Sequence, residues 1–172
     1  MKISYNWLKE YLPIDLEPKK VSQLLTDSGL EVEGEEMFQS VKGGLEGLII
    51  GEVLTKEKHP DADRLNLTTV DIGSGIPANI VCGAPNVDVG QKVVVAPVGA
   101  TIHPIEGDGF KMKKAKIRGQ LSEGMICGED EIGLGVGHDG IMVLDNSAIA
   151  GTKASKYFAV ETDTIFEIGL TP

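Results

Sequence analysis

The first 40 residues combine helical periodicity with a strand pattern. Residues 4–11 predict a short helix that Ser4 caps and that Pro13 ends, and residues 18–28 predict a second helix. Residues 30–34 then alternate between apolar and acidic side chains, which predicts a half-exposed strand. The first helix places three large apolar side chains on one face: Trp7, Leu8 and Tyr11. This end of the chain is therefore predicted to be α+β.

The middle of the chain is rich in short strands. Its apolar or alternating runs are separated by turns that contain Gly, Pro, Asn and Asp, and no long helical period interrupts them. The predicted strands are Leu48–Leu54, Leu65–Ile72, Ala78–Cys82, Lys92–Pro97, Ala115–Arg118 and Ile141–Leu144. Several short strands of this kind predict a small, all-β closed barrel. A short helix is expected at 129–132, a helix at 152–159 and a final strand at 164–168.

The aromatic side chains indicate a domain boundary. Only Phe110 lies in the middle of the chain, and the other rings lie near the two ends, at Tyr5, Trp7, Tyr11, Phe38, Tyr157, Phe158 and Phe166. Because large rings dominate core energetics, the two ends are predicted to share one small core, with the middle inserted between them. Of the 22 glycines, 19 lie between Gly43 and Gly151, which supports this division. The predicted domains are residues 1–40 with 151–172, and residues 41–150.

Composition excludes several classes of protein. The 172 residues are 41% hydrophobic, which argues against wholesale disorder. No apolar run is long enough to span a membrane, and the N-terminus lacks the apolar region of a signal peptide, so a cytoplasmic location is expected. The two cysteines form neither a CxxC pair nor a disulfide framework. The net charge of −10 argues against a generally basic nucleic-acid binder.

One segment differs from this acidic background. Residues 111–118 contain five basic side chains and no acidic one: Lys111, Lys113, Lys114, Lys116 and Arg118. The other 164 residues carry 11 basic and 26 acidic side chains, a balance of −15. A basic stretch in an acidic protein attracts anions locally and orients their approach. The alternative is a solvated strand edge that lysines keep soluble.

Other candidate chemistry is weak in the sequence. His59, Asp61 and Asp63 offer an imidazole and two carboxylates, but the further oxygens and the Gly of a calcium loop are missing, so a structured loop is favoured over a metal site. Residues 133–137 lack the GxGxxG spacing and the strand-to-helix setting of a phosphate loop. Both cysteines, flanked by apolar residues and Gly, are interpreted as buried thiols. We therefore expect no catalytic or metal-binding residue in this chain.

Three segments stand in a characteristic order and spacing. They read HPDADRL at 59–65, IVCGAPN at 80–86, and KKAKIRG followed by SEGM within 113–125. Together they resemble the tRNA-binding OB-fold domain that several synthetases and tRNA-binding cofactors share. The segments MKISYNWLKEY at 1–11 and LTDSGLEVE at 25–33 resemble the N-terminus of bacterial phenylalanyl-tRNA synthetase β subunits. The resemblance covers essentially the whole chain.

The resemblance implies both a fold and a role. The implied fold is a five-stranded OB-fold barrel inserted into a small α+β domain, within a longer β subunit. The implied role is that of a non-catalytic, tRNA-binding accessory module. The ligase as a whole attaches phenylalanine to its tRNA and is an α2β2 assembly, in which the partner α subunit, and not this chain, uses ATP and Mg²⁺. The alternative is an architectural domain that helps to assemble the β subunit and touches little RNA.

The resemblance also implies RNA-binding residues. The matching positions are Arg64, Asn86, Lys114, Lys116, Arg118, Ser122 and Met125, and Lys111 and Lys113 complete the basic stretch. The basic side chains would meet phosphates. For Ser122 and Met125 a structural role, as a cap and a core side chain, is equally compatible, and for Asn86 a turn former is favoured. Because Phe110 is the single ring of the middle region, contact is expected through phosphates and RNA shape rather than base stacking.

Overall fold

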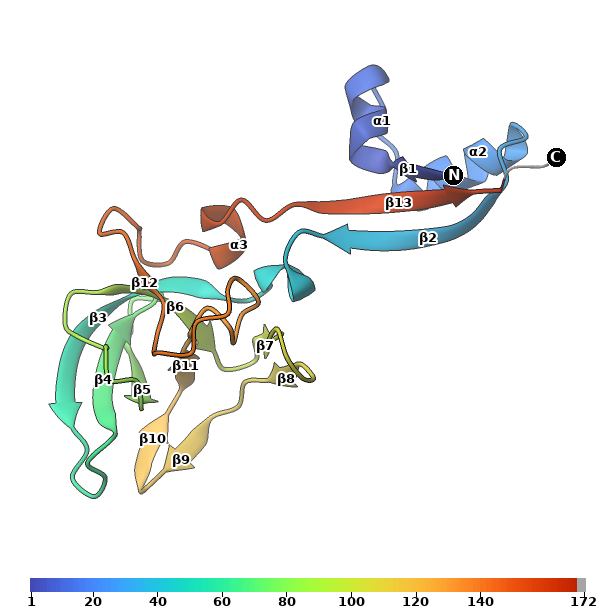
Figure 1. Cartoon of the computed structure of the whole chain (residues 1–172). Coiled ribbons are helices and arrows are strands. Elements are labelled where there is room, and N and C mark those ends of the chain that lie inside the picture. Colours follow the sequence, from blue (N-terminus) through green and yellow to red (C-terminus); the bar gives the residue numbers. More distant parts are fainter. Residues whose placement is uncertain (170–172) are drawn as a thin grey trace. The chain divides into compact units, whose positions relative to one another are not determined.

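The computed structural model describes residues 1–169 of the chain (Figure 1). Contacts divide it into two compact units. The first, here called the terminal unit, comprises Met1–Ser40 and the segment that begins at Glu161. The second, called the barrel unit, is Val41–Val160. This division lies ten residues later than the predicted boundary at residue 151.

The terminal unit is a three-stranded antiparallel sheet with two helices. The central strand comes from the C-terminal segment. It pairs with two strands of the N-terminal segment, one before and one after the two helices, so the sheet joins the two ends of the chain. In sheet order the strands are β1 (Lys2–Ser4), β13 (Thr162–Ile168) and β2 (Val32–Gln39), and the helices are α1 (Tyr5–Tyr11) and α2 (Pro18–Asp27). The Ser4 hydroxyl accepts a hydrogen bond from the Trp7 N–H at 2.9 Å, which confirms the predicted N-cap.

The core of the terminal unit is small. Its fully buried apolar side chains are Tyr5, Val21, Phe166 and Ile168, and the rings of Tyr5 and Phe166 meet edge-to-face with centroids 6.1 Å apart. The prediction that Trp7 and Tyr11 share this core is wrong, since they are 52% and 67% exposed. Of the predicted face only Leu8 packs against this core, and Tyr5, one turn earlier, is the ring that α1 buries there.

The barrel unit contains a nearly closed, five-stranded antiparallel barrel, which confirms the predicted OB-fold. Neighbouring strands follow the order β11-β6-β3-β4-β5. The long strand β3 pairs with β6 through Ile49–Glu52 and with β4 from Glu52 onward, and a bulge at Leu54 interrupts the pairing with β4. The strands are β3 (Ile49–Lys58), β4 (Asn66–Asp71), β5 (Ala78–Cys82), β6 (Lys92–Pro97) and β11 (Gly124–Ile126).

Shorter elements surround the barrel. They are the 3-10 helix η1 (Lys42–Leu45), β7 (Thr101–Ile102), β8 (Phe110–Lys111), β9 (Ala115–Ile117), β10 (Gln120–Ser122), β12 (Val143–Leu144) and α3 (Ala154–Tyr157). Two antiparallel hairpins, β7–β8 and β9–β10, extend from the barrel (Figure 1). The strand β12 adds to β6 beside the barrel.

Strand β6 is buried on both faces, which explains its continuous apolar run. Val93 and Val95 face the barrel interior, where they pack with residues such as Val53, Val70 and Ile80. On the other face, Val94 and Ala96 belong to a second core cluster, which is separate from the barrel interior. That cluster is completed by Leu45, Leu48, Ile50, Ala100, Ile102, Cys127, Ile132, Leu144, Ala148 and Ala154.

The second core cluster also explains the later domain boundary. Ala154 is fully buried in it, and its N–H donates to the Leu48 carbonyl at 2.9 Å. Phe158 and Val160 pack against the same cluster. The rings at 157 and 158 therefore lie in the barrel unit, although the aromatic pattern predicted that they share a core with the N-terminal rings.

Two predicted helices differ from the structure. Residues 129–132 form a turn, because the Glu129 carbonyl accepts from Leu134 and its carboxylate accepts from the Gly137 N–H at 2.8 Å. These bonds fold the glycine-rich segment back on itself instead of continuing a helix. The expected helix at 152–159 is shorter, since α3 covers four residues.

We expect Phe166→Ala to unfold the terminal unit selectively. Removing a buried ring costs about 3–5 kcal/mol, which is large for a core of four buried side chains. Trp7, the only tryptophan, should lose its native fluorescence while the NMR signals of the barrel strands persist. The exposed Ile76→Ala serves as the control. Cooperative loss of both units would contradict their division.

Candidate nucleic-acid interface

The basic stretch forms a hairpin that ends in a tight turn. Strands β9 and β10 pair antiparallel, with Ile117 opposite Gln120, so two residues form the loop. Arg118 and Gly119 have φ angles of 49° and 88°, as a type I′ turn requires, and Gly adopts such a φ without strain. The turn places the exposed Arg118 at the tip of the hairpin, ahead of Lys116.

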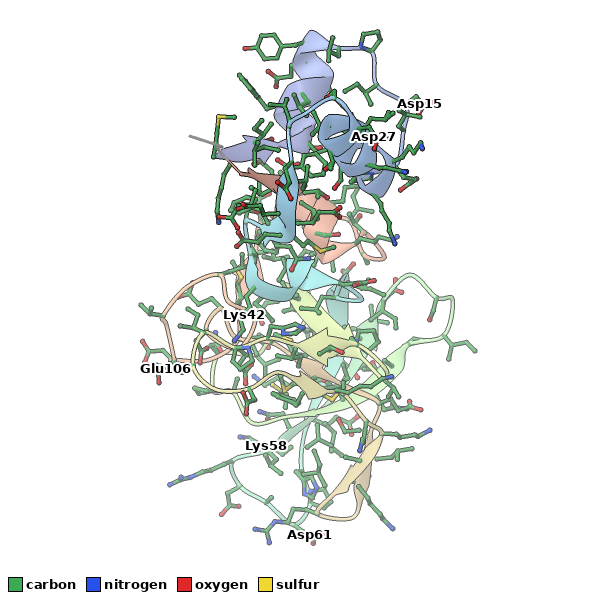
Figure 2. All side chains as sticks on the ribbon, turned by 90° about the vertical axis from the view of Figure 1, so that its right-hand side faces the viewer. Asp15, Asp27, Lys42, Lys58, Asp61 and Glu106 are labelled. Carbon is green, nitrogen blue, oxygen red and sulfur yellow. The ribbon has the colours of Figure 1, made fainter. Side chains whose placement is uncertain are left out.

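His59 joins this hairpin to the loop between β3 and β4. Its side chain is buried, its Nδ1 accepts from the Asp61 N–H at 3.0 Å, and its Nε2 lies 3.4 Å from the Ile117 carbonyl oxygen. Because Nδ1 accepts, the ring proton is on Nε2, which donates to Ile117. The loop with Lys58 and Asp61 and the hairpin lie at the same end of the barrel unit (Figures 1 and 2). His59 thus brings Arg64, whose loop also carries the exposed Asp61 and Asp63, to the same end of the unit as the basic hairpin.

The predicted cations are all exposed. They are Arg64 in the β3–β4 loop, Lys111 in β8, Lys113 and Lys114 before β9, Lys116 in β9 and Arg118 in the turn. Among residues 1–169, only Lys114 of this set forms an ion pair, with the Glu123 carboxylate at 2.8 Å. The Lys114 hydrogen bond, followed by one from the Asn79 backbone, lowers the pKa of Glu123. The other five side chains keep their charge available to an external anion.

A groove of about 720 Å³ lies beside the hairpin. Lys113, Ala115 and Ile117 line it on the hairpin side, and Met125 and Ile126 of β11 also line it. Asp130, Glu131 and Asp139 contribute acidic side chains from the segment after β11. The groove therefore has a basic contribution from the hairpin and an acidic contribution from the 128–141 segment. An extended polyanion is favoured along the hairpin and disfavoured by the acidic segment.

Ser122 closes the barrel rather than presenting its hydroxyl. It is 3% exposed; its Oγ accepts from the Val81 N–H at 3.1 Å and donates to the Gly124 carbonyl at 2.9 Å. The Glu123 N–H bonds to the Asn79 carbonyl at 2.8 Å, so two successive residues join the chain to β5. Met125 is half-buried, packs against the second core cluster and also lines the groove. Both side chains thus have structural contacts, as the alternative interpretation allowed.

Asn86 holds the segment that lines the far side of the groove. Its amide Nδ2 donates to the Ile141 carbonyl at 2.8 Å, and its Oδ1 accepts from the Ile141 N–H at 2.9 Å. Any Cβ at Gly140 would lie 2.1 Å from Asn86 Oδ1, so the close approach requires glycine there. The side chain of Asn86 thus has a structural role, but through bonds that span 55 residues and not as the turn former that the sequence favours.

The competing site chemistry has structural explanations in the described part of the chain. Residues 1–169 contain no group of three or more His, Cys, Asp and Glu side chains that could hold a metal ion. In the glycine-rich segment 133–137, Gly135 and Gly137 pack closely against the Glu129 carboxylate, which accepts a hydrogen bond from the Gly137 N–H. Burial raises the pKa of the Cys82 thiol, which disfavours a reactive thiolate. No described helix is long and apolar enough to cross a membrane.

Sequence reasoning missed two residues that shape this interface. The sequence predicts a loop at His59 but not its contact with Ile117, because the two residues are 58 positions apart. The sequence-based set of site residues also omits Glu123, which neutralises one of the lysines. A signal for Glu123 was present, since it is the first acidic residue after the basic stretch. No local signal identifies the partner of His59.

Comparison with known protein families shows to which family the chain belongs. Residues 48–153, more than half of the chain, match the family described as "Putative tRNA binding domain". The chain belongs to this tRNA-binding domain family. The match of the tRNA-binding domain spans the barrel strands, and it contains all nine residues that the sequence assigned to RNA binding.

Curated relatives of this tRNA-binding domain protein are named phenylalanine–tRNA ligase beta subunit. Those of Bacteroides fragilis, Porphyromonas gingivalis and Bacillus subtilis are 56%, 52% and 44% identical over the whole of this chain. The chain spans about a fifth of their length, 21% in each case. The solved C-terminal domain of Plasmodium vivax p43 matches 60% of this chain and 56% of its own, with a TM-score of 0.43 and 23% identity, which is too loose to support an argument.

We expect Asn86→Ala to loosen the segment around Ile141 without unfolding the barrel. The substitution removes two hydrogen bonds and leaves the Ile141 backbone groups unpaired, at a cost of about 1–3 kcal/mol. Amide hydrogen exchange at Ile141 should accelerate, while exchange in β6 should not change. Asn86→Asp keeps the acceptor and should retain part of the protection. Unchanged exchange at Ile141 in the alanine variant would contradict this role.

Proposed function

We propose that this chain is the tRNA-binding accessory module of a phenylalanine–tRNA ligase β subunit. Its membership of the tRNA-binding domain family and the shared name of its relatives support the proposal. The assignment of the RNA-binding residues rests on the contact between His59 and Ile117, which holds the Arg64 loop beside the hairpin of Lys116 and Arg118. Six exposed basic side chains, five of them outside ion pairs within residues 1–169, then face solvent around one hairpin.

The proposed contact is to phosphate groups and RNA shape. Phe110 is the only aromatic ring between Phe38 and Tyr157, and it is 47% exposed. One ring offers a single stacking position, whereas sequence-tolerant stacking usually uses several. The acidic side chains of the groove restrict a polyanion to the hairpin side. Binding by this module should therefore be weak, dependent on salt and little dependent on sequence.

The rest of the proposed enzyme lies outside this chain. We propose that the full ligase attaches phenylalanine to the phenylalanine-specific tRNA in the cytoplasm, as an α2β2 assembly in which the α subunit uses ATP and Mg²⁺. We assign no chemical step of the ligase to the residues of this chain. Their role in this proposal is to bind and orient tRNA.

The decisive test is a titration of tRNA at about 50 and about 200 mM salt. Lys113→Glu/Lys116→Glu reverses two exposed charges that have no ion pair within residues 1–169. We expect weaker binding at low salt and a log–log salt slope reduced by about 1.5, because two phosphate contacts are lost. Lys19→Glu/Lys20→Glu in α2 makes the same charge change in the other unit and should bind like wild type. Equal losses for both variants would reject a local site.

A second variant tests whether the His59 contact organises the interface. We expect His59→Ala to weaken tRNA binding several-fold although every basic side chain remains, because the Arg64 loop is no longer held against the hairpin. Faster amide exchange at Asp61 would verify that the loop has been released. Released exchange with unchanged affinity would show that the two segments act independently.

The architectural role remains the second candidate, and a specific observation favours it. The terminal unit carries 4 lysines against 11 Asp and Glu, a balance of −7, and exposes several large apolar side chains. Such a surface suits another protein better than RNA. If charge reversal on the hairpin leaves tRNA affinity unchanged, the architectural role is the one to retain.

A further inference from the structure

Lys114 and Glu123 face each other at the open end of the basic hairpin. Ala115 of β9 is opposite Ser122 of β10. One step further in this antiparallel register, Lys114 comes opposite Glu123, and its ammonium group donates to the Glu123 Oε1 at 2.8 Å. Opposite charges that face each other across two strands stabilise the pairing of those strands. An acidic side chain is thus built into the hairpin whose cations are proposed to meet RNA.

The Glu123 carboxylate is held in place by Asn79 as well as by Lys114. The Glu123 N–H donates to the Asn79 carbonyl oxygen at 2.8 Å, which joins the residue to β5. The second carboxylate oxygen, Oε2, accepts from the Asn79 N–H and from the Asn79 side-chain amide, both at 3.4 Å. The hydrogen bond from Lys114, followed by that from the Asn79 backbone, lowers the pKa of Glu123, so the carboxylate is charged at neutral pH. This negative charge therefore stays in position when Lys114 is drawn toward another anion.

The ion pair changes what Lys114 can offer to a phosphate. The Lys114 side chain is 53% exposed, so an RNA backbone can reach it. An exposed ion pair is weak, and a phosphate can displace the carboxylate from the ammonium group. The carboxylate nevertheless remains close to that phosphate, and its repulsion offsets most of the attraction by the ammonium group. Lys114 and Glu123 together therefore give a phosphate little net attraction.

We infer that Glu123 lowers the RNA affinity of this module by masking Lys114. The two side chains act as a neutral unit, so the hairpin attracts phosphates through Lys113, Lys116 and Arg118 without a contribution from Lys114. Because affinity differences between related complexes lie mainly in the dissociation rate, masking speeds the release of tRNA. This inference rests on the proposed function, because the anion that Lys114 is withheld from is tRNA.

Glu123→Gln tests the masking, because it removes the charge and keeps an oxygen for the Asn79 contacts. We expect tRNA binding about threefold tighter, or more, at about 50 mM salt, and a log–log salt slope steeper by about 0.7–0.9, as one additional phosphate contact requires. Adding Lys114→Gln to this variant should abolish the gain. Glu10→Gln in α1 makes the same charge change in the other unit and is the control, which should bind like wild type.

NMR of the wild-type chain gives a second test that does not depend on a variant. On addition of tRNA, the side-chain signals of Lys113 and Lys116 should shift, and those of Lys114 should move much less. In Glu123→Gln, the Lys114 signals should shift as those of Lys116 do. Amide exchange at Asn79 checks that the variant keeps its link to β5. If that exchange accelerates, the signals of the wild-type chain decide the question.

Four results would overturn the inference. The first is unchanged or weaker tRNA binding by Glu123→Gln when exchange at Asn79 is retained. The second is an equal gain in Glu10→Gln, which would be an effect of net charge. The third is a gain that persists after Lys114→Gln is added, since Glu123 would then act on another group. The fourth is a shift of the Lys114 signals in the wild-type chain as large as that of Lys116.

The hairpin variant separates this inference from the proposed function. If Lys113→Glu/Lys116→Glu binds tRNA weakly and Glu123→Gln binds like wild type, the proposed function stands and the masking is rejected. If the hairpin variant binds tRNA like wild type, the hairpin has no role in RNA binding, and the masking is rejected with it.

Discussion

The burial of strand β6 on both faces is the constraint on which the barrel unit depends. One face lines the barrel interior with Val93 and Val95, so the neighbouring strands must curve around it. The other face, with Val94 and Ala96, requires a second cover that the barrel strands cannot supply. Segments on either side of the barrel in sequence, near Leu48 and Ala154, provide that cover, which draws the chain after residue 150 into the barrel unit.

Two buried polar side chains, Ser122 and His59, fix the positions of the segments that form the candidate interface. Ser122 joins the end of the basic hairpin to β5, which brings the barrel close to closure. His59 connects the Arg64 loop to Ile117, which lies in the same hairpin just before its turn. Because each bond is made by a buried group, losing it leaves an unpaired polar atom, so the geometry is held firmly. Apart from Lys114, which pairs with Glu123, the predicted cations form no ion pair within residues 1–169 and can face an external anion.

The terminal unit is stabilised differently from the barrel unit. Its sheet is formed by pairing the two ends of the chain, yet its core contains only four fully buried side chains. The sequence suggested that the N-terminal rings would build this core. The structure instead turns Tyr5 inward and leaves Trp7 and Tyr11 outward, beside acidic side chains. Aromatic side chains that the fold leaves exposed in this way are candidates for contact with another molecule.

The sequence by itself determined the elements and the chemistry of this protein. The apolar and alternating runs predicted four barrel strands, β3 to β6, but not β11; Ser4 predicted a cap, and the five cations between Lys111 and Arg118 predicted a local attraction for anions. Each of these follows from neighbouring residues, whose spacing is visible in the chain. Only the tertiary structure decided that Ser122 is buried, that Asn86 bonds to Ile141, that Glu123 neutralises Lys114, and that His59 meets Ile117. Those outcomes depend on contacts between residues far apart in sequence, because burial and pairing are set by the packed fold and not by local periodicity.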